Sequence, residues 1–185
     1  MAQIIVDTLQ DVTDPDDTLT SLREAVALAA GTPERDEITF AAELSGTLVL
    51  EQGRITIGSS LSLDGDTNGD GDIDIVIDAN GFESLQGALV IDAEDVSLSN
   101  LEIRNGREEF DPLGGNLTVQ EDASAELTNL RLLDGVSSYF AYDYDAGTVS
   151  GRYGGALANK GTVVLRDSYI ADHSRIAITS RGSLT

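Results

Sequence analysis

Residues 96–103, which read VSLSNLEI, decide the fold because their pattern returns further along the chain. Residues 125–132 read AELTNLRL and residues 163–170 read VVLRDSYI, with apolar side chains at the first, third and eighth positions. A fourth copy begins at Leu184, so the successive intervals are 29, 38 and 21 residues. Each coil of a solenoid places similar residues at the same corner, whereas sandwich strands have no such requirement. The repeat therefore predicts an all-β, right-handed parallel β-helix.

A polar pair interrupts each copy of the repeat. Its second member is Asn100, Asn129 or Asp167. In stacked coils these three side chains would lie above one another at a turn, where short polar groups can bond backbone atoms that the turn leaves unpaired. We interpret them as structural rather than functional residues.

The remaining sequence divides into one short helix and many short strands. A strand is predicted at residues 3–6, followed by a helix at about 21–30, where Ser21 and Glu24 form a capping box and Gly31 and Pro33 end the helix. After Pro33 the apolar period changes from helical to alternating, and no second helix follows. The alternating segments lie at residues 38–40, 48–50, 55–57, 61–63 and 73–77.

These segments predict a single domain over residues 1–185. Residues 1–35 form an N-terminal cap and residues 36–185 form the coils, with a long loop insertion at about 134–155. Because a new repeat starts at the last residues, the chain is expected to be a fragment of a longer one whose open C-terminal edge favours self-association.

The charge balance excludes several partners. The chain has 33 acidic and 11 basic residues, a net charge of −22. This charge repels phosphate backbones and anionic lipids, so nucleic acid is an unsuitable partner. The longest apolar run, residues 25–30, is too short for membrane insertion, and no signal peptide is visible. Self-repulsion of this size favours binding of divalent cations.

The strongest chemical signal is the acidic loop DGDTNGDGDID at residues 64–74. Ca²⁺ prefers six to eight oxygen ligands on a tightly curved backbone. Counted from Asp66, the loop resembles the first nine positions of EF-hand and dockerin loops, with Gly71 at the sharp turn and Ile73 as the apolar anchor. The twelfth position is Ile77 instead of a bidentate Glu, so a further ligand must come from elsewhere. The predicted calcium ligands are Asp64, Asp66, Asn68, Asp70, Asp72, Asp74 and Asp78, and the neighbouring-coil alternatives are Asp92, Glu94 and Asp95.

Four blocks of the N-terminal half also resemble a known family. They are TSLREA at 20–25, DEITF at 36–40, SGTLVL at 45–50 and ITIGSSLSLDG at 55–65. Together they resemble the N-terminal region of bacterial secreted β-helix proteins that carry a Cys-Ser-Leu-Arg-Glu-Ala signature, a group that includes polymorphic outer-membrane and adhesin-like proteins, some with calcium-binding RTX repeats. Thr20 stands where the signature usually has Cys.

The resemblance implies a secreted or cell-surface location and a non-catalytic, adhesin-like role. It also gives the helix a function, because Leu22, Val26 and Ala29 would cover the interior of the first coil. Calcium is the expected cofactor, and carbohydrate or another surface protein is the expected partner.

An aromatic cluster within the insertion is a candidate ligand loop. It consists of Tyr139, Phe140, Tyr142, Tyr144 and Tyr153. Exposed aromatic rings can stack on sugars or bind a protein partner. We favour the other interpretation, in which they fold back onto the solenoid as a small satellite core.

The alternative is a carbohydrate-active β-helix, such as a lyase, epimerase or hydrolase, or a carbohydrate-binding module. Asp134 and Asp172 follow the repeat at equivalent places, with Asn105 one coil before, so a stacked carboxylate pair is expected. A concave groove lined by these carboxylates and by arginines would favour this alternative. His173, the single histidine, is expected to lie solvated in a turn.

Overall fold

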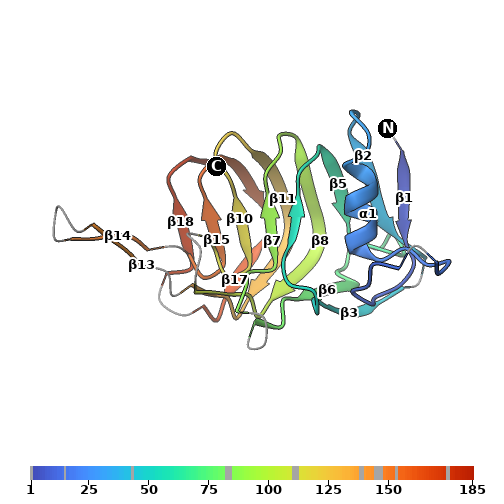
Figure 1. Cartoon of the computed structure of the whole chain (residues 1–185), viewed down its shortest axis with the longest axis horizontal. Coiled ribbons are helices and arrows are strands. Elements are labelled where there is room, and N and C mark those ends of the chain that lie inside the picture. The colour runs from blue at the N-terminus through green and yellow to red at the C-terminus, as the bar shows by residue number, and fades with distance from the viewer. Residues whose placement is uncertain are drawn as a thin grey trace.

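The computed structural model describes residues 2–14, 16–42, 44–81, 85–109, 113–137, 140–143, 148–152, 154–173 and 176–185, with the backbone alone at 140–143 and 148–152. Its coils stack along one axis, and the single helix lies beside the first strands (Figure 1). The predicted fold, an all-β right-handed parallel β-helix with one short N-terminal helix, is confirmed.

The longer sheet runs the whole length of the solenoid, and its described strands pair in parallel. The repeat copies are in the predicted register: Val96 pairs with Ala125, Ala125 with Val163, and Val163 with Leu184. This sheet contains β1 (Gln3–Val6), β2 (Asp36–Phe40), β3 (Gly46–Val49), β5 (Leu61–Asp64), β6 (Ile75–Asp78), β8 (Val96–Arg104), β11 (Ser124–Leu133), β16 (Thr162–Arg166), β17 (Tyr169–Ala171) and β19 (Ser183–Leu184).

A second parallel sheet closes the other side of the interior. It consists of β4 (Ile55–Ile57), β7 (Leu89–Ile91), β10 (Leu117–Val119), β15 (Leu157–Asn159) and β18 (Ile178–Ser180). Two small pairs complete the described strands. They are β9 (Arg107–Glu108) with β12 (Val136–Ser137), and the antiparallel β13 (Phe140–Asp143) with β14 (Thr148–Arg152).

Apolar columns fill the space between the two sheets. One column on the longer sheet contains Ile38, Leu63, Leu98, Leu127 and Leu165, each paired with the next. The first four are buried, whereas Leu165, in the last coils, is only partly buried. This stacking is what the alternating apolar pattern requires, because inward side chains recur every second residue.

Helix α1 (Leu22–Ala29) packs against β1, β2 and β4. Its apolar face, formed by Leu22, Ala25, Val26 and Ala29, is buried. The predicted capping box is present: Ser21 Oγ accepts from the Glu24 amide at 3.2 Å, and Glu24 accepts from the Ser21 amide at 2.8 Å.

Arg23 joins this helix to the first coils through an ion pair that sequence analysis missed. Its Nε lies 2.7 Å from Oδ1 of Asp11, whose side chain is 1% exposed. Its Nη2 also donates to the Gly53 carbonyl at 2.7 Å, and the Gln52 amide donates to Asp11 at 2.8 Å. The signature arginine therefore connects the helix, the preceding loop and the turn before β4.

The predicted turn stack of Asn100, Asn129 and Asp167 is confirmed, and we call it the first turn ladder. All three residues are left-handed, with φ of 54°, 50° and 49°. The bonding differs from the expectation, because side chains bond one another as well as the backbone. Asn100 Nδ2 donates to Asp64 Oδ1 at 2.7 Å, and Asn129 Nδ2 donates to Asn100 Oδ1 at 2.8 Å.

Candidate functional site

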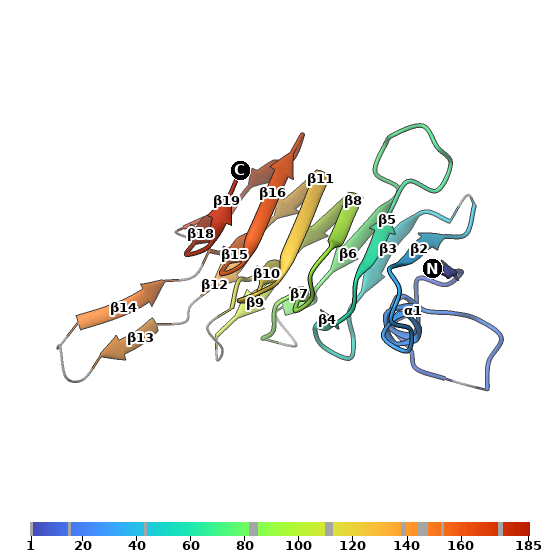
Figure 2. The ribbon, with the colours of Figure 1, turned by 90° about the horizontal axis from the view of Figure 1, so that it is seen from above.

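The acidic loop leaves the solenoid between β5 and β6, at the first turn ladder. Figure 2 shows this segment projecting beyond the body of the molecule. Gly65 starts the loop against the neighbouring coil, where a Cβ would lie only 2.2 Å from the Asn100 carbonyl oxygen. Ile73 and Asp74, predicted to belong to a strand, lie in the loop instead, and β6 begins at Ile75.

Asp66 organises the loop by accepting bonds from its backbone. Its Oδ1 accepts from the Gly69 amide at 2.7 Å, and its Oδ2 accepts from the Gly71 amide at 2.9 Å. The Gly71 amide, followed by the other loop amides, holds the pKa of Asp66 below its usual value. Gly71 itself has a φ of 85°, a conformation that suits glycine. These contacts agree with the frame counted from Asp66.

The next two polar side chains, Asn68 and Asp70, each accept a hydrogen bond from the backbone amide two residues later. Asn68 Oδ1 accepts from the Asp70 amide at 2.9 Å, and Asp70 Oδ1 accepts from the Asp72 amide at 2.9 Å. Each side chain thus bends the backbone around itself, as Asn and Asp commonly do in turns. One carboxylate oxygen of Asp70 and both of Asp72 have no bond within the described residues.

One set of contacts closes the loop on itself, and another joins it to the solenoid. Asp74 Oδ2 accepts from the Thr67 amide at 2.9 Å and from Thr67 Oγ1 at 2.8 Å. The Gly71 carbonyl accepts from Asn129 Nδ2 at 3.0 Å, which ties the middle of the loop to the first turn ladder. Through Asn129, the loop is therefore anchored to a residue that lies two coils further along the solenoid than β5, the strand from which the loop starts.

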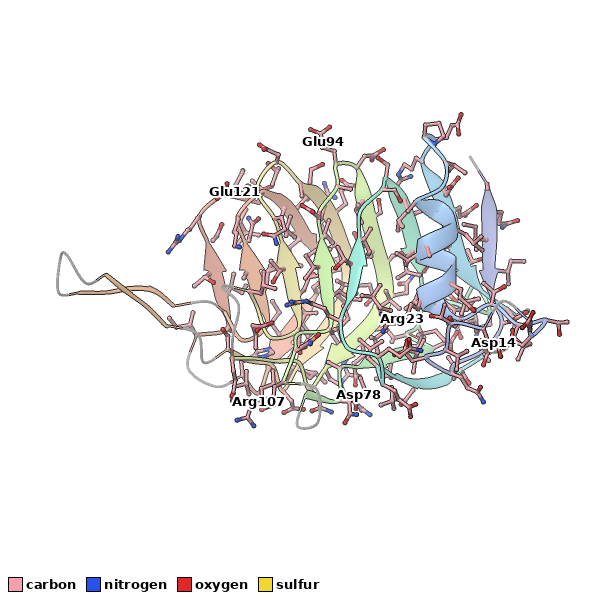
Figure 3. All side chains as sticks on the ribbon, in the orientation of Figure 1. Asp14, Arg23, Asp78, Glu94, Arg107 and Glu121 are labelled. Carbon is pink, nitrogen blue, oxygen red and sulfur yellow. The ribbon has the colours of Figure 1, made fainter. Side chains whose placement is uncertain are left out.

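The structure separates one predicted ligand from the others. Asp78 lies at the far end of β6, where its Oδ2 accepts from Arg104 Nε at 3.0 Å and from Asn105 Nδ2 at 2.8 Å. Figure 3 places Asp78 on the same edge of the solenoid as Arg107. Ile77 is fully buried, and its hydrocarbon side chain has no oxygen to offer a cation. Asp64 stays beside the loop, with its Oδ1 accepting from the Asp66 amide at 3.2 Å.

The neighbouring-coil alternatives lie at the other end of β8. Asp95 precedes Val96, which pairs with Leu61, whereas the loop starts at Asp64. Four residues of strand separate these positions by about 13 Å. Asp95 also forms an ion pair with Arg35 at 3.3 Å. Figure 3 likewise places Glu94 on the edge opposite Asp78. Among the described residues, no three His, Cys, Asp or Glu side chains already form a metal-binding group.

The aromatic insertion is a hairpin where its backbone is described. Strands β13 and β14 project away from the solenoid in both views (Figures 1 and 2). Phe140 and Tyr142 belong to β13, and Tyr139, Tyr144 and Tyr153 lie outside the described residues. The described backbone of the hairpin thus extends into solvent and does not fold back onto the solenoid.

The expected stack of Asn105, Asp134 and Asp172 is present, and we call it the second turn ladder. Its residues have φ of 57°, 52° and 59°, and the strand residues just before them are paired: Arg104 with Leu133, and Leu133 with Ala171. Residues of this ladder line a pocket of about 290 Å³. The lining consists of Gly81, Asn105, Gly106, Arg107, Asp134, Val136 and Asp172.

The expectation that His173 lies solvated in a turn is wrong. The side chain is half-buried, and both ring nitrogens contact the backbone of the preceding coil. Nε2 lies 2.8 Å from the Leu132 carbonyl oxygen, and Nδ1 accepts from the Gly135 amide at 2.9 Å. The histidine therefore fixes the turn that carries Asp172 onto the turn that carries Asp134.

Sequence analysis also missed an ion-pair network on the outer face of the longer sheet. Glu102 is 7% exposed, and its carboxylate lies 3.4 Å from Arg104 and 3.3 Å from Arg131. Arg104 also pairs with Asp78. The network extends over three neighbouring strands, β6, β8 and β11.

Comparisons with known proteins give one structural match. No protein-family model and no curated protein matches the chain. Two crystal structures of the pectin methylesterase from Aspergillus niger, in deglycosylated and penultimately deglycosylated form, each match with a TM-score of 0.48 and 16% identity. The match covers 98% of this chain but only 57% of the enzyme. In the described residues, no helix is long and apolar enough to cross a membrane.

Proposed function

We propose that this chain is a non-catalytic, secreted β-helix module that binds Ca²⁺ in the loop at residues 64–74. In this proposal it is the N-terminal cap and folding unit of a larger extracellular, adhesin-like protein of the family that carries the Ser-Leu-Arg-Glu-Ala signature. The observation that carries the calcium site is the wrapping of the loop around Asp66, whose carboxylate accepts from the Gly71 amide five residues later.

The donor set of the loop suits a hard cation. Asp66, Asn68 and Asp70 offer side-chain oxygens, Asp72 offers its backbone carbonyl, and the Oδ1 of Asp74 remains beside the Oδ2 that bonds Thr67. Asp64 is the proposed source of the final ligand, because its Oδ2 is not needed for the bond to Asn100. Asp78, which the sequence also suggested, is already paired with Arg104.

A cation here would stabilise more than the loop. The loop bonds Asn129 through Gly71, and Asn129 bonds Asn100, so the proposed site is linked to two coils of the solenoid. Binding that occurs only in the folded state stabilises that state by mass action. A module that folds fully only at high calcium is suited to folding outside the cell.

The test is thermal unfolding followed by circular dichroism, in millimolar CaCl₂ and in EGTA at matched ionic strength. We expect calcium to raise the melting temperature by several degrees, and we expect Asp66→Ala/Asp70→Ala to abolish this rise. The matched control is Asp14→Ala/Asp17→Ala, which removes the same charge and two similar turn bonds from the other acidic loop. Equal melting temperatures in calcium and EGTA, or an equal loss in the control, would refute the site.

A carbohydrate-binding or carbohydrate-active β-helix is the second candidate function. The observation that favours it is the pocket lined by Asp134, Asp172 and Arg107, which is the kind of concave site that a sugar-binding solenoid requires. Activity on soluble polysaccharides, lost in Asp134→Asn and Asp172→Asn, would support an enzyme. Binding without turnover would support a binding module.

A further inference from the structure

We propose that the pocket over the second turn ladder binds a neutral saccharide through the carboxylates of Asp134 and Asp172. This inference deepens the second candidate function and does not depend on the calcium loop. It comes from a comparison of the two turn ladders, which share a backbone conformation but differ in their hydrogen-bond donors.

The first two residues of the first turn ladder bond each other. Asn129 Nδ2 donates to Asn100 Oδ1 at 2.8 Å, so one amide provides the donor that its neighbour in the next coil needs. In the second turn ladder the residue equivalent to Asn129 is Asp134, and an ionised carboxylate only accepts. Asn105 already donates its Nδ2 to Asp78. Asn105 Oδ1 and the two carboxylates therefore form a column of acceptors without a donor among them.

Neither carboxylate finds a donor elsewhere in the described part of the chain. Asp134 and Asp172 are both exposed, and no described residue forms a hydrogen bond or ion pair with either carboxylate. Their left-handed backbone explains the choice of Asn or Asp at these turns. It does not explain why both are aspartate, because strands one coil apart lie about 4.8 Å from each other and stacked like charges repel.

The surroundings hold these carboxylates in place. His173 bonds the backbone of Leu132 and Gly135, which fastens the turn of Asp172 to the turn of Asp134. Arg107, on the pocket wall, is held by Glu109 at 2.6 Å. The pocket volume of about 290 Å³ is close to the lower limit for small-molecule sites, about 300 Å³, so the pocket suits a small ligand.

The chemistry selects a ligand rich in hydroxyl donors and without negative charge. Sugar hydroxyls donate to carboxylates and also accept from a guanidinium, so a neutral saccharide can complement both Asp134 and Arg107. A uronate would bring a third carboxylate beside two unpaired ones in a chain with a net charge of −22. We therefore infer a neutral hexose unit and exclude acidic sugars.

The test is saturation-transfer difference NMR on the full chain in millimolar CaCl₂, after circular dichroism has shown that the chain is folded. The probes are cellobiose, lactose and methyl α-mannoside, with sodium galacturonate as the acidic probe. We expect signal transfer to at least one neutral probe and none to galacturonate. Transfer to none of the neutral probes, or transfer to galacturonate at the same level, would overturn the proposal.

The decisive variant is Asp134→Asn. Asparagine tolerates this backbone and provides the donor that Asn129 provides in the first turn ladder, so the variant should fold with an unchanged or higher melting temperature. We expect it to weaken saccharide binding at least tenfold, and Asp134→Asn/Asp172→Asn to abolish it. The matched control, Asp167→Asn in the first turn ladder, should bind as the unmodified chain does. Undiminished binding in the double variant would contradict the proposal.

Discussion

At the scale of the residue, burial determines which charged side chains contribute most to the stability of the fold. Asp11 is 1% exposed and accepts bonds from Arg23 and from the Gln52 amide, whereas Arg166 is 54% exposed and pairs with Glu126, which is 59% exposed. Removing one member of a buried pair leaves an uncompensated charge, whereas an exposed guanidinium leaves little behind. The arginine of the signature is thus explained as a structural residue.

Replacing Arg23 tests this explanation. We expect Arg23→Ala to lower the free energy of unfolding by about 3–5 kcal/mol, because Asp11 would remain buried without its partner. Arg166→Ala, at an exposed ion pair with Glu126, should cost less than about 1 kcal/mol. Urea denaturation followed by circular dichroism measures both. Similar losses for the two variants would mean that the Asp11 pair is not what fastens the helix.

At the scale of the element, the strands depend on columns of side chains that cross all coils. Leu127 is fully buried between the equivalent leucines of its neighbouring coils, whereas Leu165 is partly buried in the last coils. We expect Leu127→Ala to cost about 2–5 kcal/mol and Leu165→Ala distinctly less. The measurement is the shift of the urea midpoint. A larger loss at Leu165 would show that the C-terminal coils contribute more to stability than their burial indicates.

The same columns explain how much of the structure could be predicted from the sequence. The repeat fixed the register of β8, β11 and β16, because a slip by one residue would turn every leucine outward. The partners of Arg23, Glu102 and His173 could not be predicted, because they lie on other coils or loops whose separation depends on turn lengths. The hydrogen-bonding frame of the acidic loop was predictable from Gly71, whereas the pairing of Asp78 with Arg104 was not.

At the scale of the whole molecule, the net charge of −22 and the ionised capping groups act in opposite directions as the pH falls. Protonation of surface carboxylates relieves self-repulsion. Glu24 opposes this gain, because the backbone amides of Ser21 and Asp14 lower its pKa in the folded chain. The unfolded chain then binds more protons, so the stability from Glu24 is complete above its unfolded pKa of 4.5 and is lost as pH falls through the lower, folded value.

Melting curves between pH 7 and pH 3 at 0.15 M NaCl distinguish these two effects. At this salt concentration the Debye length is about 8 Å, so exposed charges farther apart than this are largely screened. Salt therefore weakens the repulsion between surface carboxylates more than it weakens the short capping hydrogen bonds. We therefore expect a nearly constant melting temperature down to about pH 5 and a decline below pH 4.5, where Glu24 and Asp66 take up protons. Glu24→Gln should show a lower melting temperature at pH 7 and a shallower decline. A melting temperature that rises continuously on acidification would mean that self-repulsion, rather than the capping of α1, dominates the stability of the solenoid.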